Sequence, residues 1–351
     1  MIFNYKLTAG FSPLLVGGSM KKCFILFVFS NILLFAQNPP FNGNGDGSEY
    51  DPFQIWEKKD LIELADSIDN YYYSPNPTWL YNKHFKLMSD ITEPLTESVG
   101  KIGFIGHFHG NGKKITLAID FDIQTNPSFA LFQGLDGTID GLTVDGYVNS
   151  DIAAMSAISY YISYSCSISN CINNTTITSW SAGGITYSNS NSGTISNCIN
   201  NGDITGVNIV GGIAGQNEGT IINCINTGKI IATNSGSNTS IVTGDTTPNN
   251  GVGGIVACVV NSSQNISNCV NIGSVVGQGF VGGIVGLANG HPMAVTPITN
   301  CINYGCVRGI NIVGGVLGYM FNPQGVNVSN CVNVGVVEGE EDIGSIVGKS
   351  G

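Results

Sequence analysis

The chain has 351 residues, of which 48 are glycine, 10 are cysteine and only 11% are charged. A disordered chain combines high charge with low hydrophobicity, and this composition does not. The formal net charge is −11, and from Asp151 onward the basic residues are only Lys229, Arg308 and Lys349. A nucleic-acid partner is therefore not expected, because such binders carry a basic surface that contacts phosphates.

Residues 1–36 have the pattern of an upstream extension followed by a secretory signal peptide, Met20–Ala36. Lys21 and Lys22 precede the apolar run "CFILFVFSNILLFA", which ends at the small residue Ala36. The run is shorter than the roughly 20 residues of a membrane-spanning helix, and we expect no membrane span in the mature chain. An uncleaved N-terminal anchor is the alternative. The signal peptide predicts a secreted or cell-surface location.

Residues 37–84 are expected to be a leader with one capping helix. In the segment 57–69, "EKKDLIELADSID", Leu61, Leu64 and Ile68 recur at helical spacing. A helix ahead of a repeat stack would cover the first coil, which has no preceding neighbour. The segment 71–81 is expected to be a loop.

Residues 85–150 read as short strands separated by Gly or Asn, and we interpret them as irregular first coils of the repeat region 151–351. In that region the motif Asn-Cys-Ile/Val-Asn occurs six times. Its first asparagines are Asn170, Asn197, Asn223, Asn268, Asn300 and Asn330, and its cysteines are Cys171, Cys198, Cys224, Cys269, Cys301 and Cys331.

Glycine pairs follow the motif in the same phase. Five copies have a pair 12 or 13 residues after the cysteine, with Ser345 replacing the second glycine in the last copy, and after Cys224 the distance is 29. The glycines predicted to form turns are Gly183, Gly211, Gly212, Gly253, Gly254, Gly282, Gly283, Gly314 and Gly315. Glycine and asparagine tolerate left-handed backbone angles, which suits both residue types to turns.

A period near 30 residues predicts a stacked repeat architecture. The stretch 194–219 contains three strand candidates, "TISNCIN", "GDITG" and "IVGGIAG", and leaves no room for a helix. We therefore predict an all-β fold: a single-stranded right-handed parallel β-helix, or β-solenoid, with a short N-terminal capping helix. The insertion at 229–250 is expected to project as a polar loop.

The repeats resemble the GLUG-motif family of bacterial secreted and surface proteins. The resemblance is carried by "VGGIAGQNEGTIINC", "VGGIVGLANG" and "VGGVLGYM", and by the opening "DPFQIWEKKDLIELA" and "IGHFHGNGKKI", over about residues 50–351. It implies an adhesin-like β-solenoid and supplies no catalytic residue. Some GLUG-like repeats precede the metallopeptidase domain of immunoglobulin A-cleaving enzymes, whose His-Glu-x-x-His motif is absent from this sequence.

The motif cysteines should form a buried column of free thiols, with disulfides between coils as the alternative, and the motif asparagines should form hydrogen-bonded ladders. Aligning the turns predicts two ion pairs between coils, Asp203–Lys229 and Arg308–Glu338. We predict no cofactor.

Two further patterns could carry chemistry. His107 and His109 share one strand face, as metal ligands would, although a surface pair is favoured and His84 and His291 read as isolated. The acidic run 338–342 lacks the spacing of a calcium motif, so a solvated edge is expected, and no metal site is predicted.

The sequence therefore favours a non-enzymatic protein for adhesion or ligand display, with an unknown extracellular glycan or protein as partner. A plain structural stalk is one alternative. The other is a carbohydrate-active β-helix enzyme, a lyase or hydrolase, whose acids would come from the irregular coils: Asp120, Asp122, Asp136, Asp140 and Asp145.

Overall fold

The fold is known from a computed structural model, which describes residues 43–70, 79–120, 128–233, 251–260, 264–290 and 295–351. All of these lie in the larger of two units of the chain, which spans residues 39–351. The predicted signal peptide, the polar insertion from residue 234 to 250, most of the expected loop 71–81, His291 and Asp122 fall outside the described residues.

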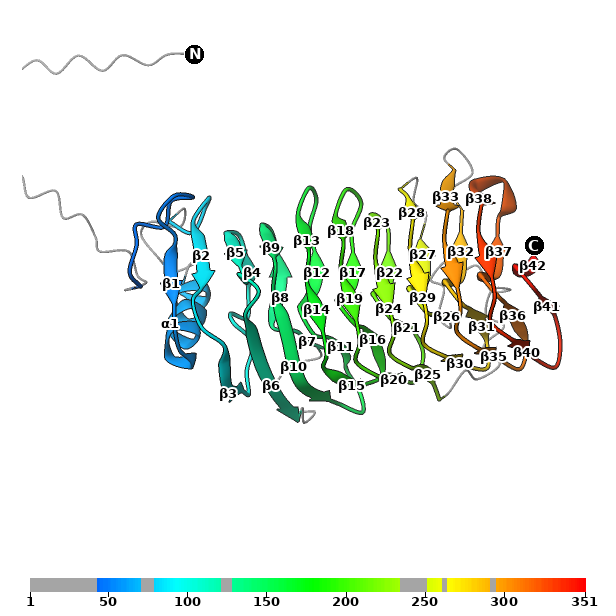
Figure 1. The fold of residues 1–351 in the computed structure, drawn as a ribbon, viewed down its shortest axis with the longest axis horizontal. Helices are drawn as coiled ribbons and strands as arrows, with labels where there is room; N and C mark the ends of the chain where they lie inside the picture. The colour runs from blue at the N-terminus through cyan, green and yellow to red at the C-terminus, as the bar shows by residue number, and fades with distance from the viewer. Residues whose placement is uncertain (1–42, 71–78, 121–127, 234–250, 261–263, 291–294) are drawn as a thin grey trace, which may run out of the picture. The chain divides into compact units, whose positions relative to one another are not determined.

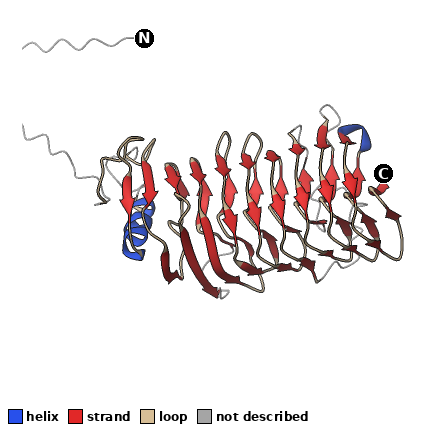
Figure 2. Ribbon diagram, viewed as in Figure 1, coloured by secondary structure: helices blue, strands red, loops and turns tan. Residues whose placement is uncertain are grey.

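The described residues form a parallel β-solenoid whose coils contribute strands to four sheets (Figures 1 and 2). Sheet A has ten strands in sequence order: β1 Phe53–Ile55, β2 His84–Leu87, β5 His107–His109, β9 Thr138–Asp140, β13 Ser167–Ser169, β18 Thr194–Ser196, β23 Thr220–Ile222, β28 Ile266–Ser267, β33 Thr296–Thr299 and β38 Val326–Ser329.

Sheet B has 15 strands and divides into two arms at β10, Thr143–Asn149, which pairs with β6, Lys114–Asp120, and through β6 with β3, Ile91–Leu95. The first arm holds β14 Ile172–Asn173, β19 Ile199–Asn200, β24 Ile225–Asn226, β29 Val270–Asn271, β34 Ile302–Asn303 and β39 Val332–Asn333. The second arm holds β15 Thr176–Thr178, β20 Ile204–Gly206, β25 Ile230–Ala232, β30 Val275–Val276, β35 Val307–Arg308 and β40 Val337–Glu338.

Sheets C and D complete each coil. The nine strands of sheet C are β4 Gly103–Phe104, β8 Phe132–Leu135, β12 Ser159–Ile162, β17 Thr186–Asn189, β22 Ala214–Asn217, β27 Val256–Val260, β32 Val285–Asn289, β37 Leu317–Phe321 and β42 Val347–Ser350. The eight of sheet D are β7 Ser128–Phe129, β11 Ala154–Ser156, β16 Ser181–Gly183, β21 Val210–Gly211, β26 Gly251–Gly253, β31 Phe280–Gly282, β36 Ile312–Gly314 and β41 Ile343–Gly344.

One regular coil shows where the strand prediction was too coarse. The expected segment "TISNCIN" is two strands, β18 and β19, because Asn197 between them has a φ of 54° and turns the chain. The expected segment "IVGGIAG" is likewise split into β21 and β22 at Gly212. Each predicted segment of this kind therefore contains a corner, and the coil has more sides than the three expected.

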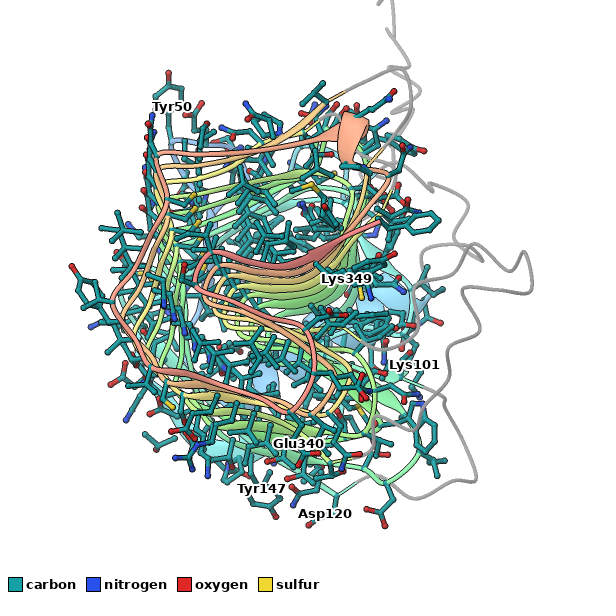
Figure 3. The ribbon with its side chains drawn as sticks, turned by 90° about the vertical axis from the view of Figure 1, so that its right-hand side faces the viewer. Tyr50, Lys101, Asp120, Tyr147, Glu340 and Lys349 are labelled. Atoms are coloured by element: carbon teal, nitrogen blue, oxygen red, sulfur yellow. The ribbon has the colours of Figure 1, made fainter. Side chains whose placement is uncertain are left out.

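The winding matches the predicted phase of the repeats. Ile195 of β18 pairs in parallel register with Ile168 of the preceding coil and Ile221 of the following one. Parallel strands lie about 4.8 Å apart, so equivalent side chains of successive coils stack in columns. The view along the stack shows the coils superimposed (Figure 3). The predicted parallel β-solenoid is confirmed.

The helix is present and the leader is not wholly irregular. Helix α1, Lys58–Asp69, has Glu57 as its N-cap residue and buries Leu61, Leu64 and Ile68, as its spacing predicts. The segment 37–84, expected as a leader and a helix, also supplies the first strand of sheet A, since Phe53 pairs with Phe85. A short 3₁₀ helix, η3, lies at Pro323–Gly325.

The core changes character along the stack. In the irregular coils it is aromatic, with the rings of Phe104 and Phe108 centred 5.1 and 5.2 Å from that of Phe132. In the regular coils it consists of Ile, Val, Ala and Cys side chains that repeat in register. Large aromatic rings fill the interior of the first coils, whose sequences do not repeat. Small side chains suit the later coils, where equivalent residues stack in regular columns.

Candidate functional site

The motif cysteines form the expected column. Cys171, Cys198, Cys224, Cys269 and Cys301 are fully buried and Cys331 is partly exposed, and all six are free thiols. The Sγ of Cys198 donates to the backbone oxygen of Ser196 at 3.3 Å, a contact that recurs from coil to coil. Burial raises the pKa of the Cys198 thiol, and burial raises that of Cys258, which lies outside the column, to about 12. The raised pKa keeps the Cys198 and Cys258 thiols protonated at neutral pH.

The first asparagine of each motif lies on the surface in a left-handed conformation, as expected, with φ between 52° and 57° for Asn170, Asn197, Asn223, Asn268, Asn300 and Asn330. The amide of Asn197 donates to the Oδ1 of Asn170 in the preceding coil, at 3.3 Å, and Asn223 and Asn268 repeat this contact. This outer ladder is exposed to solvent.

The last asparagine of the motif forms a second ladder that the sequence reading did not separate from the first. Asn200 and Asn226 are fully buried, and the Asn200 amide donates to the Oδ1 of Asn226 at 2.7 Å and to the backbone oxygen of Gly202 at 2.9 Å. The inner ladder consists of Asn173, Asn200, Asn226, Asn271, Asn303 and Asn333. It joins successive coils inside the solenoid.

The glycine pairs fit against this inner ladder, and a left-handed backbone angle is not what requires glycine there. Gly183, Gly211, Gly212, Gly253, Gly254, Gly282, Gly283, Gly314 and Gly315 are not among the glycines with positive φ. They are needed for space, because a Cβ on Gly212 would lie 2.1 Å from the backbone oxygen of Gly254 and 2.7 Å from the Cγ of Asn226. The asparagine side chain thus occupies the volume that a larger residue would require.

One of the two predicted ion pairs is present. Arg308 Nε lies 2.5 Å from Glu338 Oε2, with both side chains about half exposed. Asp203 does lie next to Lys229, but its Oδ1 accepts a hydrogen bond from the Lys229 backbone N–H at 2.8 Å. The predicted register was right, but the predicted contacting atom of Lys229 was wrong. The short Asp203 side chain reaches the neighbouring backbone N–H more readily than it reaches the ammonium at the end of a long, mobile side chain.

The acids proposed for carbohydrate chemistry do not converge among the described residues. Asp120 accepts hydrogen bonds from Tyr147 and Asn149, at the edge labelled in Figure 3, while Asp145 binds the Lys114 ammonium at 3.1 Å. Asp145 pairs in register with Thr116, four residues before Asp120 on β6, so the two carboxylates are roughly 13 Å apart along the strand. Paired glycosidase carboxylates lie about 5–9.5 Å apart.

The other two described candidates lie apart from these. Asp140 is on sheet A, and Asp136 lies between β8 and β9, where a Cβ added to Gly103 would lie 2.7 Å from its Oδ2. The fifth, Asp122, falls outside the described residues.

Three histidines form a cluster on the outer face of sheet A. His84 pairs in register with His107, and their rings stack with centroids 4.4 Å apart. His84 Nδ1 lies 2.9 Å from His109 Nε2, and His109 Nδ1 lies 2.7 Å from Asp140 Oδ1. His84, expected to be isolated, is therefore central. Burial, then the charges of the other two histidines, lowers the pKa of His84, and burial lowers that of His107.

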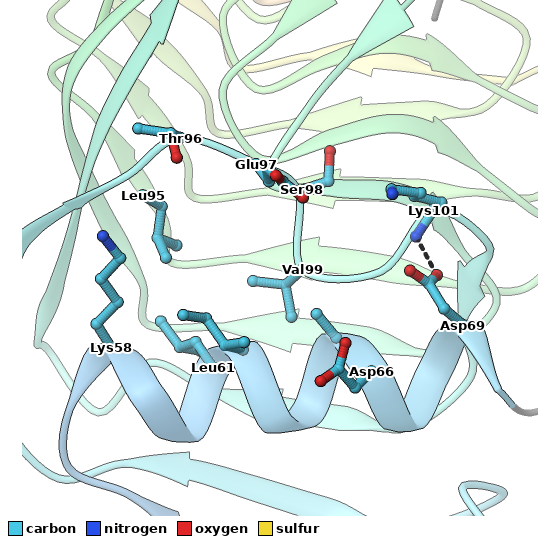
Figure 4. Close-up of a pocket in the computed structure, with 12 residues that line it drawn as sticks. Lys58, Leu61, Asp66, Asp69, Leu95, Thr96, Glu97, Ser98, Val99 and Lys101 are labelled. Carbon is cyan, nitrogen blue, oxygen red and sulfur yellow. Dashed lines mark hydrogen bonds between the residues drawn. The ribbon is translucent and has the colours of Figure 1, made fainter. Parts of the chain in front are cut away.

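A cavity of about 290 Å³ lies between α1 and the segment after β3 (Figure 4). Its floor is formed by Leu61, Leu95 and Val99, and at one end the backbone N–H of Lys101 donates to Asp69. At the other end the Lys58 ammonium is already paired with Glu93 at 3.1 Å. The cavity follows the contact between helix and solenoid.

The residue directly after each motif lies on the surface, and its chemistry changes along the stack. In the earlier regular coils it is polar: the Asn201 amide donates to Asn174 at 2.9 Å, and Thr227 donates to Asn201 at 2.8 Å. In the last three coils it is Ile272, Tyr304 and Val334, which are 52%, 52% and 62% exposed.

These side chains form one surface together with their neighbours two residues earlier in the chain. Val270, Ile302 and Val332 pair in register and also face outward, with Val332 48% exposed. We call the six residues Val270, Ile272, Ile302, Tyr304, Val332 and Val334 the apolar patch. A contiguous apolar surface is a feature of interaction sites, whereas single exposed hydrophobic residues are common on any protein surface. The patch was not predicted from the sequence, although the residue directly after the motif changes along the chain from Asn or Thr to Ile, Tyr and Val.

Comparison with known proteins gives the fold and little more. No protein-family profile and no curated protein matches the chain. A crystal structure of a protein described as a putative immunoglobulin A1 protease from Bacteroides ovatus is similar, with a TM-score of 0.50, 17% identity and 86% of each chain covered. At that identity the similarity shows a shared β-solenoid fold.

None of the described helices is both long and apolar enough to cross a membrane.

Proposed function

We propose that this protein is a non-enzymatic, secreted or cell-surface β-solenoid of the GLUG-motif type that binds an extracellular partner through the apolar patch. The single observation that carries the proposal is the change at one column of the surface. The column is hydrogen-bonded and polar at Asn174, Asn201 and Thr227, and it becomes apolar and half exposed at Ile272 and Tyr304.

Several features support this proposal. The backbone under the patch is held by the inner asparagine ladder, so the patch is presented on a rigid surface at little entropic cost. Five of its six side chains are aliphatic, which favours a protein partner over a glycan. The separation of Asp120 from Asp145 supports a non-enzymatic role.

We extend the proposal to two aspects of the architecture. The winding is proposed to be right-handed, the hand that parallel crossover connections adopt in nearly all proteins. Helix α1 is proposed to cap the stack, since its Leu61, Leu64 and Ile68 join the same buried core as the coils.

The test is an array of extracellular matrix proteins and glycans probed with the purified chain. We expect binding to proteins without turnover, and loss of that binding in the double variant Ile272→Asn, Tyr304→Asn, which restores the polar chemistry of the earlier coils. The matched control is Tyr164→Asn, because Tyr164 is 67% exposed and lies outside the patch.

Other outcomes would decide against the proposal. If the double variant still binds the same proteins, the apolar patch is not the binding surface. If the original protein binds only glycans, the partner is not a protein. Release of sugar from a glycan would instead identify a carbohydrate-active enzyme, and no binding at all would favour a structural stalk.

A further inference from the structure

The histidine cluster on sheet A contains two imidazole nitrogens that face each other across neighbouring strands. His84 Nδ1 and His109 Nε2 are 2.9 Å apart, the ring planes differ by 7°, and the centroids are 5.2 Å apart. The centroid separation exceeds the nitrogen separation by about two ring radii, so the rings meet edge to edge. The two nitrogens therefore point at each other in the plane of the rings.

Asp140 fixes which nitrogen of His109 is available. Its carboxylate accepts a hydrogen bond from His109 Nδ1 at 2.7 Å, so the proton of the neutral ring is on Nδ1 and the lone pair is on Nε2. A carboxylate that holds the far nitrogen of an imidazole in this way is the usual outer-shell partner of a metal-binding histidine. His84 at present donates its Nδ1 proton to this lone pair.

We propose that His84 and His109 form a two-histidine site for a divalent transition-metal ion such as Ni²⁺ or Zn²⁺, with Asp140 as the positioning residue for His109. On binding, the His84 proton moves from Nδ1 to Nε2 through solvent, and the ion takes its place between the two nitrogens. The number of bound protons is unchanged, and both rings remain neutral ligands.

Metal binding requires both rings to move. Metal–nitrogen bonds of about 2.0–2.1 Å place two ligand nitrogens roughly 3.3 Å apart at a tetrahedral angle, so the nitrogens need to separate by only a few tenths of an ångström. Because they now point straight at each other, each ring must also tilt by roughly 35° to direct its lone pair at the ion. Both side chains are partly exposed on the outer face of sheet A, where such adjustment meets no packed core.

The remaining coordination positions belong to water. Within the described residues no group of three or more His, Cys, Asp or Glu side chains is arranged to hold a metal ion, so the proposed site has two protein ligands. Imidazole nitrogen suits Ni²⁺, Cu²⁺ and Zn²⁺, whereas Mg²⁺ and Ca²⁺ require oxygen ligands. The site should therefore discriminate strongly against the alkaline-earth ions.

His107 provides the matched control. It is on the same strand as His109 and is likewise partly exposed, but its Nδ1 is bonded to Thr138 Oγ1 at 2.8 Å and its ring stacks on His84. It is adjacent to the site without directing a nitrogen into it.

The experiment is calorimetric titration of the tag-free, chelator-stripped full chain with NiCl₂ and ZnCl₂, with MgCl₂ as the ionic control. We expect one saturable site per chain, and at least tenfold weaker binding in His84→Gln and in His109→Gln. His107→Gln should stay within about threefold of the original protein, and Cys306→Ser, which removes a partly exposed thiol, should have no effect.

Asp140→Asn, compared with a control carboxylate, tests whether Asp140 acts by orienting the His109 ring or only by its negative charge. An outer-shell partner of this kind contributes about 10–100-fold to metal affinity. We expect at least a tenfold loss for Asp140→Asn, whereas Asp136→Asn, a carboxylate between β8 and β9, should leave affinity unchanged. Far-ultraviolet dichroism of each variant reports whether the fold is retained.

Three results would overturn the proposal. They are the absence of saturable binding, a loss in His107→Gln equal to that in His84→Gln, and an unchanged affinity in folded His109→Gln. In the last two cases the cluster would be a hydrogen-bonded chain of imidazoles that binds no ion at this pair. None of these results bears on the apolar patch, which lies on sheet B.

Discussion

Replacing Asn226 by alanine tests the inner ladder directly. The side chain is fully buried, donates to Asn271 Oδ1 at 2.8 Å and to the Gly228 backbone oxygen at 2.9 Å, and accepts from Asn200 at 2.7 Å. Asn226→Ala removes all three bonds, and water cannot replace them because Asn200 and Asn271 are also fully buried. Three buried polar groups lose their partner, and each such loss costs about 1–3 kcal/mol, so we expect a loss of roughly 3–9 kcal/mol.

The control is Asn223→Gly, three residues earlier in the same motif. Asn223 is exposed and has a φ of 57°, which glycine adopts without strain. It loses only solvent-exposed hydrogen bonds to Asn197 and Asn268, so the expected cost is below about 1 kcal/mol.

Urea unfolding followed by far-ultraviolet dichroism in reducing buffer gives the comparison. Coils of a solenoid can open separately, so hydrogen exchange of peptides covering residues 220–232 should be measured alongside. The reasoning is refuted if Asn226→Ala is within 1 kcal/mol of Asn223→Gly and exchange in that segment is unchanged.

Three further changes test other contacts. Gly212→Ala should cost several kcal/mol or prevent folding in the same urea assay, because the added Cβ would lie 2.1 Å from a backbone oxygen. The control is Gly112→Ala, where nothing lies within 4 Å of the added Cβ and only the φ of 67° disfavours alanine. This control should cost about 1–2 kcal/mol. The folded pKa of Cys258 is raised from 9.0 to about 12, so its contribution to stability is complete below pH 9 and falls by about 1.4 kcal/mol per pH unit above it. The stability difference between the original protein and Cys258→Ala should follow that slope between pH 9 and 10.5, and parallel curves would contradict it. Arg308→Ala should leave the melting temperature nearly unchanged, since its ion pair is exposed; a clear drop in the melting temperature would show that the pair is not a simple surface contact.

The stacking of coils could be predicted from the sequence because the motif recurs in phase. Once the phase is known, the neighbours of Cys198 and of Arg308 in the next coil follow from alignment. The same alignment did not say which asparagine of the motif turns outward. Asn197 and Asn200 are both polar residues beside a buried cysteine, and only the left-handed φ of Asn197 separates their roles.

The histidine cluster could not be predicted because it lies in the irregular coils. His84 and His109 are 25 residues apart with no repeat to set their register, so no spacing rule brings them together. The apolar patch is a different case. It lies within regular coils, where aligning the residue after the motif identifies Tyr304 and Ile272 as neighbours of the same column, and only its exposure required the structure.

The contact between Gly212 and Asn226 joins two consecutive repeats, because the asparagine side chain of one coil packs against the glycine of the coil before it. A deletion or duplication whose two breakpoints occupy equivalent positions, such as Gly212 and Gly254, brings a glycine from one repeat against an asparagine from another and preserves the fit. Homologous genes can therefore gain or lose whole coils by unequal recombination without passing through an unfolded product. The length of such proteins is free to drift between lineages while their cross-section stays constant.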